Sequence, residues 1–161
     1  MKRILFFVMF LLAGALNLKA QTQDPSQWSI SANPEAARAG ETIELVFNVK
    51  IEPKWYLYSS DFDPELGPMV TAFKFESNNT CELVGEVVPI NPKKKYDALW
   101  GGEYTYFKKE GKFIQKVKIL KDKPVIKVIV TGQVCSDNNE KCIPFEKKLS
   151  LSLASKKNKT K

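Results

Sequence analysis

The sequence contains no histidine, and this absence removes several kinds of site. A Ser-His-Asp triad, a Cys-His pair, a histidine-ligated zinc and a haem attached through C-x-x-C-H all need that side chain. Cysteine is scarce too, with only Cys81, Cys135 and Cys142 in the chain. Two thiolates alone do not complete a tetrahedral metal site. We therefore expect neither a metal nor any other cofactor.

Long apolar runs are absent after the first twenty residues. Lys2 and Arg3 precede the apolar run 4–12, and a small residue, Ala20, follows shortly after it. This order is typical of a secretory signal cleaved after Ala20, with an uncleaved anchor as the alternative. The run is short for a bilayer, which takes about 20 apolar residues. We therefore expect residues 1–20 to be a signal peptide and the protein to be exported.

The balance of charge argues against nucleic acid as a partner. The whole chain has 25 basic and 18 acidic residues, a net charge of +7. Cleavage after Ala20 would leave 22 basic against 18 acidic residues, or +4. Much of this excess lies in residues 155–161, a polar tail without periodicity that we expect to be disordered. The other basic residues are scattered, so we expect no nucleic-acid partner.

Alternation of apolar and polar residues is abundant, as at Ile43, Leu45, Phe47 and Val49, and no long helical period interrupts it. Turn-forming pairs such as Gly67-Pro68 separate the alternating segments. Closely spaced strands with such punctuation are typical of an immunoglobulin-like β-sandwich, and we expect one such all-β domain over residues 21–154. The expected strands are 28–31, 42–49, 55–58, 71–75, 81–88, 103–107, 112–120, 125–134 and 143–153, with a hairpin turned at Glu110-Gly111.

Cys135 directly follows the expected strand 125–134, and Cys142 directly precedes the expected strand 143–153. In each strand one parity is apolar and should face the core, and both cysteines fall on the other, more polar parity. The polar loop 136–141 predicts antiparallel neighbours whose Cα atoms lie about 4.5–5.5 Å apart, within reach of a disulfide. Two interpretations stay open at this point. The bond is either a staple worth about 2.5 kcal/mol or a reactive pair on a face that meets a partner. In the expected strand 125–134, the residues that should face the core are Ile126, Val128, Val130 and Val134.

Three segments carry a resemblance to a known family. Residues 134–146 (VCSDNNEKCIPFE) hold two cysteines around a polar loop, then an apolar residue and a proline. Residues 55–58 (WYLY) form an aromatic strand, and residues 96–101 (YDALWG) an acidic and aromatic loop. These segments resemble, in this order, the active site, aromatic strand and cap loop of the N-terminal periplasmic domain of the thiol:disulfide interchange protein DsbD. The likeness extends over residues 28–153 and implies a stand-alone form of that domain.

The resemblance implies an immunoglobulin-like domain in the periplasm that takes part in thiol–disulfide exchange. Reducing equivalents would come from a thioredoxin-like domain or a membrane electron-transfer protein. They would pass to a periplasmic disulfide isomerase or another oxidised thiol protein, including those of cytochrome maturation. Exchange proceeds by attack of a thiolate on a disulfide sulfur, so the domain would be a component of a protein-disulfide reductase.

The resemblance also gives the two cysteines different roles. Cys142 would form the mixed disulfide with a partner, and Cys135 would resolve it. Tyr56 and Tyr58 would flank the pair. Cys81 shares the parity of apolar neighbours, and we expect it to be a small buried residue.

The cap loop would control access to the pair. Asp97 matches an acidic residue whose charge would restrain the reactivity of a nearby thiol. Leu99 and Trp100 would cover the cysteines until a partner displaces the loop. Leu99 stands where the family commonly has phenylalanine, so Trp100 is the stronger candidate for the shield.

A second interpretation belongs to a different class of protein. The chain would then be an exported immunoglobulin-like binding or adhesion module, with the Cys135–Cys142 bond as a structural staple. Tyr56 and Tyr58 would be ordinary aromatic residues of the core and rim, and Asp97 a solvated loop residue. The reduction potential separates the two, because structural disulfides usually lie below about −300 mV.

Overall fold

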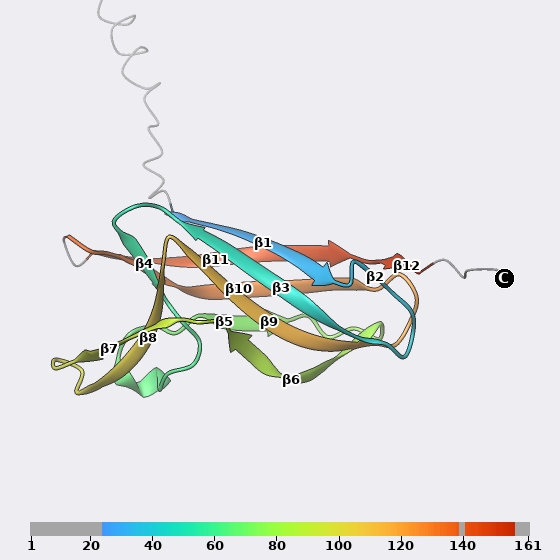
Figure 1. Ribbon diagram of the computed structural model, residues 1–161, viewed down its shortest axis with the longest axis horizontal. Helices are drawn as coiled ribbons and strands as arrows, with labels where there is room; N and C mark the ends of the chain where they lie inside the picture. Colours follow the sequence, from blue (N-terminus) through green and yellow to red (C-terminus); the bar gives the residue numbers. More distant parts are fainter. Residues whose placement is uncertain (1–23, 139–140, 157–161) are drawn as a thin grey trace, which may run out of the picture.

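The computed structural model describes residues 24–138 and 141–156, and its regular structure is almost entirely β (Figure 1). The expected signal peptide and residues 157–161 lie outside this part of the chain. No helix in the described ranges has the length and apolar character needed to cross a membrane. In chain order the elements are β1 (Ser26–Asn33), β2 (Ala36–Ala37), β3 (Thr42–Ile51), β4 (Trp55–Tyr58), the 3-10 turn η1 (Pro64–Leu66), β5 (Ala72–Phe75), β6 (Cys81–Pro89), β7 (Lys93–Asp97), β8 (Gly102–Lys108), β9 (Glu110–Ile119), β10 (Val125–Ser136), β11 (Cys142–Ser152) and β12 (Ala154–Ser155).

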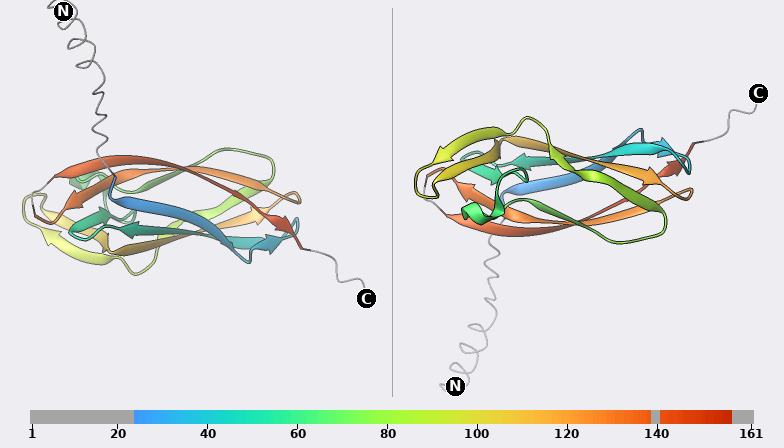
Figure 2. Two further views of the ribbon diagram at one scale, coloured as in Figure 1. Left: turned by 90° about the horizontal axis from the view of Figure 1, so that it is seen from above. Right: turned by 90° about the horizontal axis from the view of Figure 1, so that it is seen from below.

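Two layers of antiparallel strands face each other across an elongated core (Figure 2). In one layer β3 lies between β1 and β9, and β9 also pairs with β6. In the other layer β10 pairs with β11 along its length, and with β5 and β4 on its other side. At one end β4 pairs with β8, and β8 with β7. The fold is the all-β, immunoglobulin-like β-sandwich that the alternation predicted.

The core is formed by the alternating residues that face inward from both layers. In β3 the four predicted residues, from Ile43 to Val49, are all buried, and in β10 the predicted set from Ile126 to Val134 is buried as well. Aromatic rings connect the layers. The ring of Trp28 in β1 contacts Phe145 in β11 with centroids 5.6 Å apart, and Phe47 in β3 contacts Phe73 in β5 at 4.9 Å. Burial of these large apolar surfaces is the main contribution to the stability of the sandwich.

One polar side chain, Gln115, lies in this core and is 1% exposed. Its amide nitrogen donates to the carbonyl oxygens of Val84 (3.2 Å), Gly85 (3.1 Å) and Lys116 (2.8 Å). The register of β6 shifts between Val84 and Val88, and Gly85 there has a φ of +71°. Gln115 thus donates to carbonyl groups that this irregularity removes from the strand ladder. These hydrogen bonds compensate for the burial of its polar amide group.

The connection between β8 and β9 differs from the predicted hairpin. We expected a turn at Glu110-Gly111 between two paired strands, and this was wrong. The turn is at Lys109, with a φ of +68°, and only Lys108 and Glu110 pair across it. The physical reason is that β8 pairs with β4 and β7 whereas β9 pairs with β3 and β6, so the chain changes partners at this corner.

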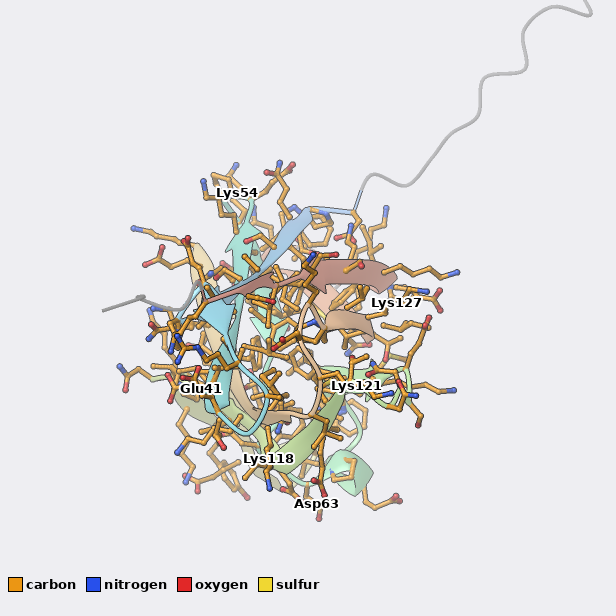
Figure 3. The ribbon with its side chains drawn as sticks, turned by 90° about the vertical axis from the view of Figure 1, so that its right-hand side faces the viewer. Glu41, Lys54, Asp63, Lys118, Lys121 and Lys127 are labelled. Carbon is orange, nitrogen blue, oxygen red and sulfur yellow. A yellow bond between two sulfur atoms is a disulfide. The ribbon has the colours of Figure 1, made fainter. Side chains whose placement is uncertain are left out.

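A short parallel pair of strands, β2 and β12, closes the opposite end of the sandwich. The ammonium group of Lys156 lies 2.8 Å from Oε2 and 3.0 Å from Oε1 of Glu41. Figure 3 looks onto this end, where Glu41 and Lys121 are labelled. Regular structure therefore continues through Ser155, past the boundary that we expected at Ala154.

Candidate functional site

The disulfide joins the paired ends of β10 and β11. Cys135 and Cys142 are direct partners in the antiparallel register, and their Cα atoms are 4.0 Å apart. At the next pair the amide of Ser136 donates to the carbonyl oxygen of Lys141 at 2.8 Å. The cysteines therefore occupy a non-hydrogen-bonded pair, the position at which side chains on neighbouring strands approach most closely. The observed separation is shorter than the range expected from the sequence, in the direction that such a pair favours.

The two cysteines differ in exposure, which the sequence did not indicate. Cys142 is exposed, whereas Cys135 is 0% exposed. The parity argument placed both on the polar face, and Cys135 does point away from the main core. That face is covered at this position, however, because Tyr58 and Tyr104 pack with Cys135 in a second buried cluster.

Four tyrosines from two strands form this cover. Tyr56 and Tyr58 come from β4, and Tyr104 and Tyr106 from the paired strand β8. Ring centroids are 5.3 Å apart for Tyr56–Tyr58, 5.2 Å for Tyr58–Tyr104 and 5.8 Å for Tyr104–Tyr106. The β4 tyrosines were predicted to flank the pair, and Tyr56 is the register partner of Cys135. The β8 tyrosines were missed, although their spacing in an expected strand already placed both on one face.

The buried hydroxyl groups of this cluster stay protonated. Burial, and then the hydrogen bond shared with Tyr56, raise the pKa of Tyr58 well above its ordinary value. The two hydroxyl oxygens are 3.4 Å apart. Burial also raises the pKa of Tyr104, against the opposing effect of Lys95. Tyr58 and Tyr104 therefore present neutral side chains to Cys135 at physiological pH.

A pocket of about 430 Å³ opens beside the disulfide. It brings together Cys142, both predicted tyrosines and all three predicted residues of the cap loop, whereas Cys135 lies behind them. Its lining also contains residues that the sequence did not single out. The lining residues are Tyr56, Tyr58, Lys95, Asp97, Leu99, Trp100, Tyr104, Tyr106, Lys108, Ser136, Asp137 and Cys142.

The cap loop between β7 and β8 is shaped by Asp97. Its Oδ1 accepts the amide hydrogens of Leu99 (2.9 Å) and Trp100 (3.3 Å), and its carbonyl oxygen accepts that of Gly101 (2.8 Å). These bonds define a contribution of Asp97 to loop geometry that the sequence did not predict. The expectation that the charge of Asp97 restrains the reactivity of a nearby thiol stays a prediction.

Leu99 and Trp100 border the pocket without burying Cys142. Leu99 is 85% exposed and Trp100 is 47% exposed. The Trp100 ring lies against Gly67 so closely that an added Cβ would clash with ring carbons. A side chain at Gly67 would therefore displace the ring. Shielding of the disulfide by these two residues stays a prediction.

The loop between the cysteines is fixed by Asp137. Both of its carboxylate oxygens lie 2.8 Å from Nζ of Lys108, and this hydrogen bond raises the pKa of Lys108. The amide of Asp137 donates to the carbonyl oxygen of Lys54 at 2.8 Å. The first residues of the loop are thereby attached to the start of β4 and the end of β8.

The described part of the chain offers few other residues that could form a metal-binding or reactive site. No group of three or more cysteine, aspartate or glutamate side chains there is arranged to hold a metal ion. Cys81 is a free, half-buried cysteine that packs against the main core, with its sulfur 3.7 Å from Oδ1 of Asn78.

Comparison with known proteins places this geometry in a family. Residues 23–154 match the family described as thiol:disulfide interchange protein DsbD, N-terminal. No curated protein sequence matches the chain. Among solved structures, the N-terminal periplasmic domain of ScsB from Proteus mirabilis has a TM-score of 0.55 at 18% identity, which shows a shared fold. The match covers 84% of this chain and 49% of that one, so the chain spans about half the length of its ScsB relative.

Two structures from Neisseria meningitidis are similar at a lower level. The reduced DsbD N-terminal domain has a TM-score of 0.48 at 16% identity, covering 78% of this chain and 86% of that one. The DsbD N-terminal domain in its complex with the PilB N-terminal domain has a TM-score of 0.48 at 13% identity, covering 81% and 89%.

Proposed function

The chain belongs to the family of DsbD N-terminal domains, and we propose that it exchanges disulfides with partner proteins through Cys135 and Cys142. One observation carries this proposal. The two sulfurs of a single disulfide are placed unequally, with Cys142 exposed at a pocket and Cys135 buried under tyrosines. A partner thiol or disulfide meets Cys142 first, because Cys135 is covered.

The proposed reaction has two steps. In the reduced protein the Cys142 thiolate attacks a partner disulfide, forming a mixed disulfide and releasing the partner's other sulfur as a thiolate. Cys135 then loses its proton to solvent and attacks the sulfur of Cys142. This releases the second partner thiolate and restores the Cys135–Cys142 bond, so two electrons have passed to the partner.

The donor and acceptor follow from the same proposal. A thioredoxin-like or membrane electron-transfer protein reduces the pair, and an oxidised thiol protein such as a disulfide isomerase receives the electrons. We place the protein in the periplasm, with residues 1–20 removed as a signal peptide. The family assignment and the periplasmic character of the ScsB relative support this location.

Measurement of the reduction potential separates this function from a structural staple. The purified protein is equilibrated with mixtures of reduced and oxidised glutathione or dithiothreitol, and the free thiols are trapped and counted. We expect a potential in the range of thiol–disulfide exchange proteins, about −120 to −270 mV. A potential below about −300 mV in the folded protein would identify a structural bond. Circular dichroism of the reduced form serves as the control for folding.

A further inference from the structure

We propose that this site selects disulfide partners whose reactive sulfurs are surrounded by negative charge. The proposal rests on the proposed exchange function and names the chemistry of the partner. Its basis is β7, which carries three consecutive lysines, Lys93, Lys94 and Lys95, immediately before the cap loop. All three are exposed.

One of these lysines, Lys95, lines the pocket that contains Cys142, and Lys93 lies on the same face of the sheet. In the antiparallel register Lys93 is opposite Tyr106 and Lys95 is opposite Tyr104, and directly opposed residues share a face of the sheet. Both tyrosines line the pocket, as does Lys95 itself. Lys94 points to the other face, where its ammonium group pairs with Glu103 at 2.5 Å.

The carboxylates of the pocket are already engaged. Asp137 pairs with Lys108, and Asp97 accepts two amide hydrogens of its own loop. Within residues 24–138 and 141–156, no carboxylate lies within ion-pair distance of Lys93 or Lys95. Lys93 and Lys95 therefore have no carboxylate ion-pair partner in the described rim, and because the loop amides do not cancel the charge of Asp97, the net charge of the rim is positive by one. A partner with carboxylates around its disulfide would supply the missing countercharges and would be steered toward Cys142.

Small disulfides of different charge test this directly. The reduced protein is mixed with 3,3′-dithiodipropionate (two carboxylates), cystamine (two ammonium groups) or 2-hydroxyethyl disulfide (neutral). In each case two protein thiols become the Cys135–Cys142 disulfide, the small disulfide becomes two thiols, and protons are balanced through solvent. Each rate is divided by the rate of the neutral thiol 2-mercaptoethanol with the same disulfide, which removes intrinsic differences between the probes.

We expect the normalised rate for the dianion to exceed that for the dication severalfold at low salt. The ratio should approach one at high salt, because the screening length falls from about 30 Å at 0.01 M to about 3 Å at 1 M. Lys93→Gln with Lys95→Gln should lower the low-salt ratio severalfold. The matched control, Lys118→Gln with Lys121→Gln, removes two exposed lysines from the far end of the sandwich (Figure 3) and should leave it unchanged.

The outcomes distinguish a failure of the charge selection from a failure of the exchange function. A low-salt ratio near or below one, or an equal loss in the control variant, would overturn the charge selection. Failure of the neutral disulfide to form the Cys135–Cys142 bond in folded, reduced protein would instead overturn the exchange function itself.

Discussion

Cys135 and Cys142 share one bond but have different surroundings. Cys142 belongs to the exposed edge strand β11, whereas Cys135 lies in β10 between β11 and β4, under the tyrosine cover. A buried thiol in neutral surroundings is disfavoured as a thiolate, because desolvation penalises the charged form. We therefore expect the two sulfurs to differ in reactivity, with the exposed sulfur of Cys142 reacting first.

This difference predicts unequal trapping by the two serine variants. Cys135→Ser should accumulate a mixed disulfide at Cys142 when mixed with oxidised glutathione, because no second sulfur is left to resolve it. Cys142→Ser should accumulate several times less, since Cys135 is covered. Intact-protein mass spectrometry gives the mixed-disulfide fraction. Both variants should be made with Cys81→Ser, so that the third cysteine does not contribute. Equal trapping would contradict the assigned roles.

At the scale of elements, alternation predicted the long strands well and the site only in part. The segment 42–49 was recognised because its apolar residues repeat at every second position. β7 was missed, since Lys-Lys-Lys-Tyr-Asp has no such repeat and is stabilised by its pairing with β8. The burial of Cys135 was beyond sequence reasoning for a similar reason. The rings of Tyr104 and Tyr106 reach it through the β4–β8 pairing, which connects residues far apart in the chain.

The cap loop is the element whose movement we expect to control access. Trp100 lines the pocket beside Cys142 and packs on Gly67, so Trp100→Ala should open one side of the pocket. We expect alkylation of reduced Cys142 by iodoacetamide to become severalfold faster. Tyr96→Ala is a matched control, because Tyr96 is 60% exposed in the same hairpin and lies outside the pocket lining. An alkylation rate in Trp100→Ala equal to that of wild type would show that Trp100 is not the shield.

On the scale of the whole molecule, the candidate site and the short β2–β12 pair lie at opposite ends of the sandwich. The disulfide, the tyrosine cover and the cap loop occupy the end at β4 and β8 (Figure 1). At the far end β2 pairs with β12, and Glu41 pairs with Lys156 across 115 positions of sequence. This contact joins the residue that follows β12 to the loop before β3, and its strength should depend on the ionisation of Glu41.

The Glu41–Lys156 pair predicts a specific acid dependence of stability. The hydrogen bond from Lys156, with help from the Arg38 amide, lowers the pKa of Glu41 below its ordinary value of 4.5. The contribution of the pair is therefore complete above pH 4.5 and is lost as pH falls through the lowered pKa. Glu41→Gln should reduce the free energy of unfolding slightly at pH 7, as for other exposed pairs, and the difference should vanish in acid.

Urea titrations at several pH values measure this difference. Lys156→Gln should give the same pattern, and the double variant should lose no more than either single variant, because the pair acts as a unit. A difference between wild type and Glu41→Gln that persists below the lowered pKa would assign the effect to something other than the ion pair.

The separation of the two buried clusters has a consequence for which substitutions the domain tolerates. The main core of phenylalanine, leucine and valine is separate from the small cluster of Tyr58, Tyr104 and Cys135. Substitutions around the tyrosines and the cap loop therefore leave most of the folding energy untouched. We therefore expect single substitutions at this end of the sandwich to leave the domain folded.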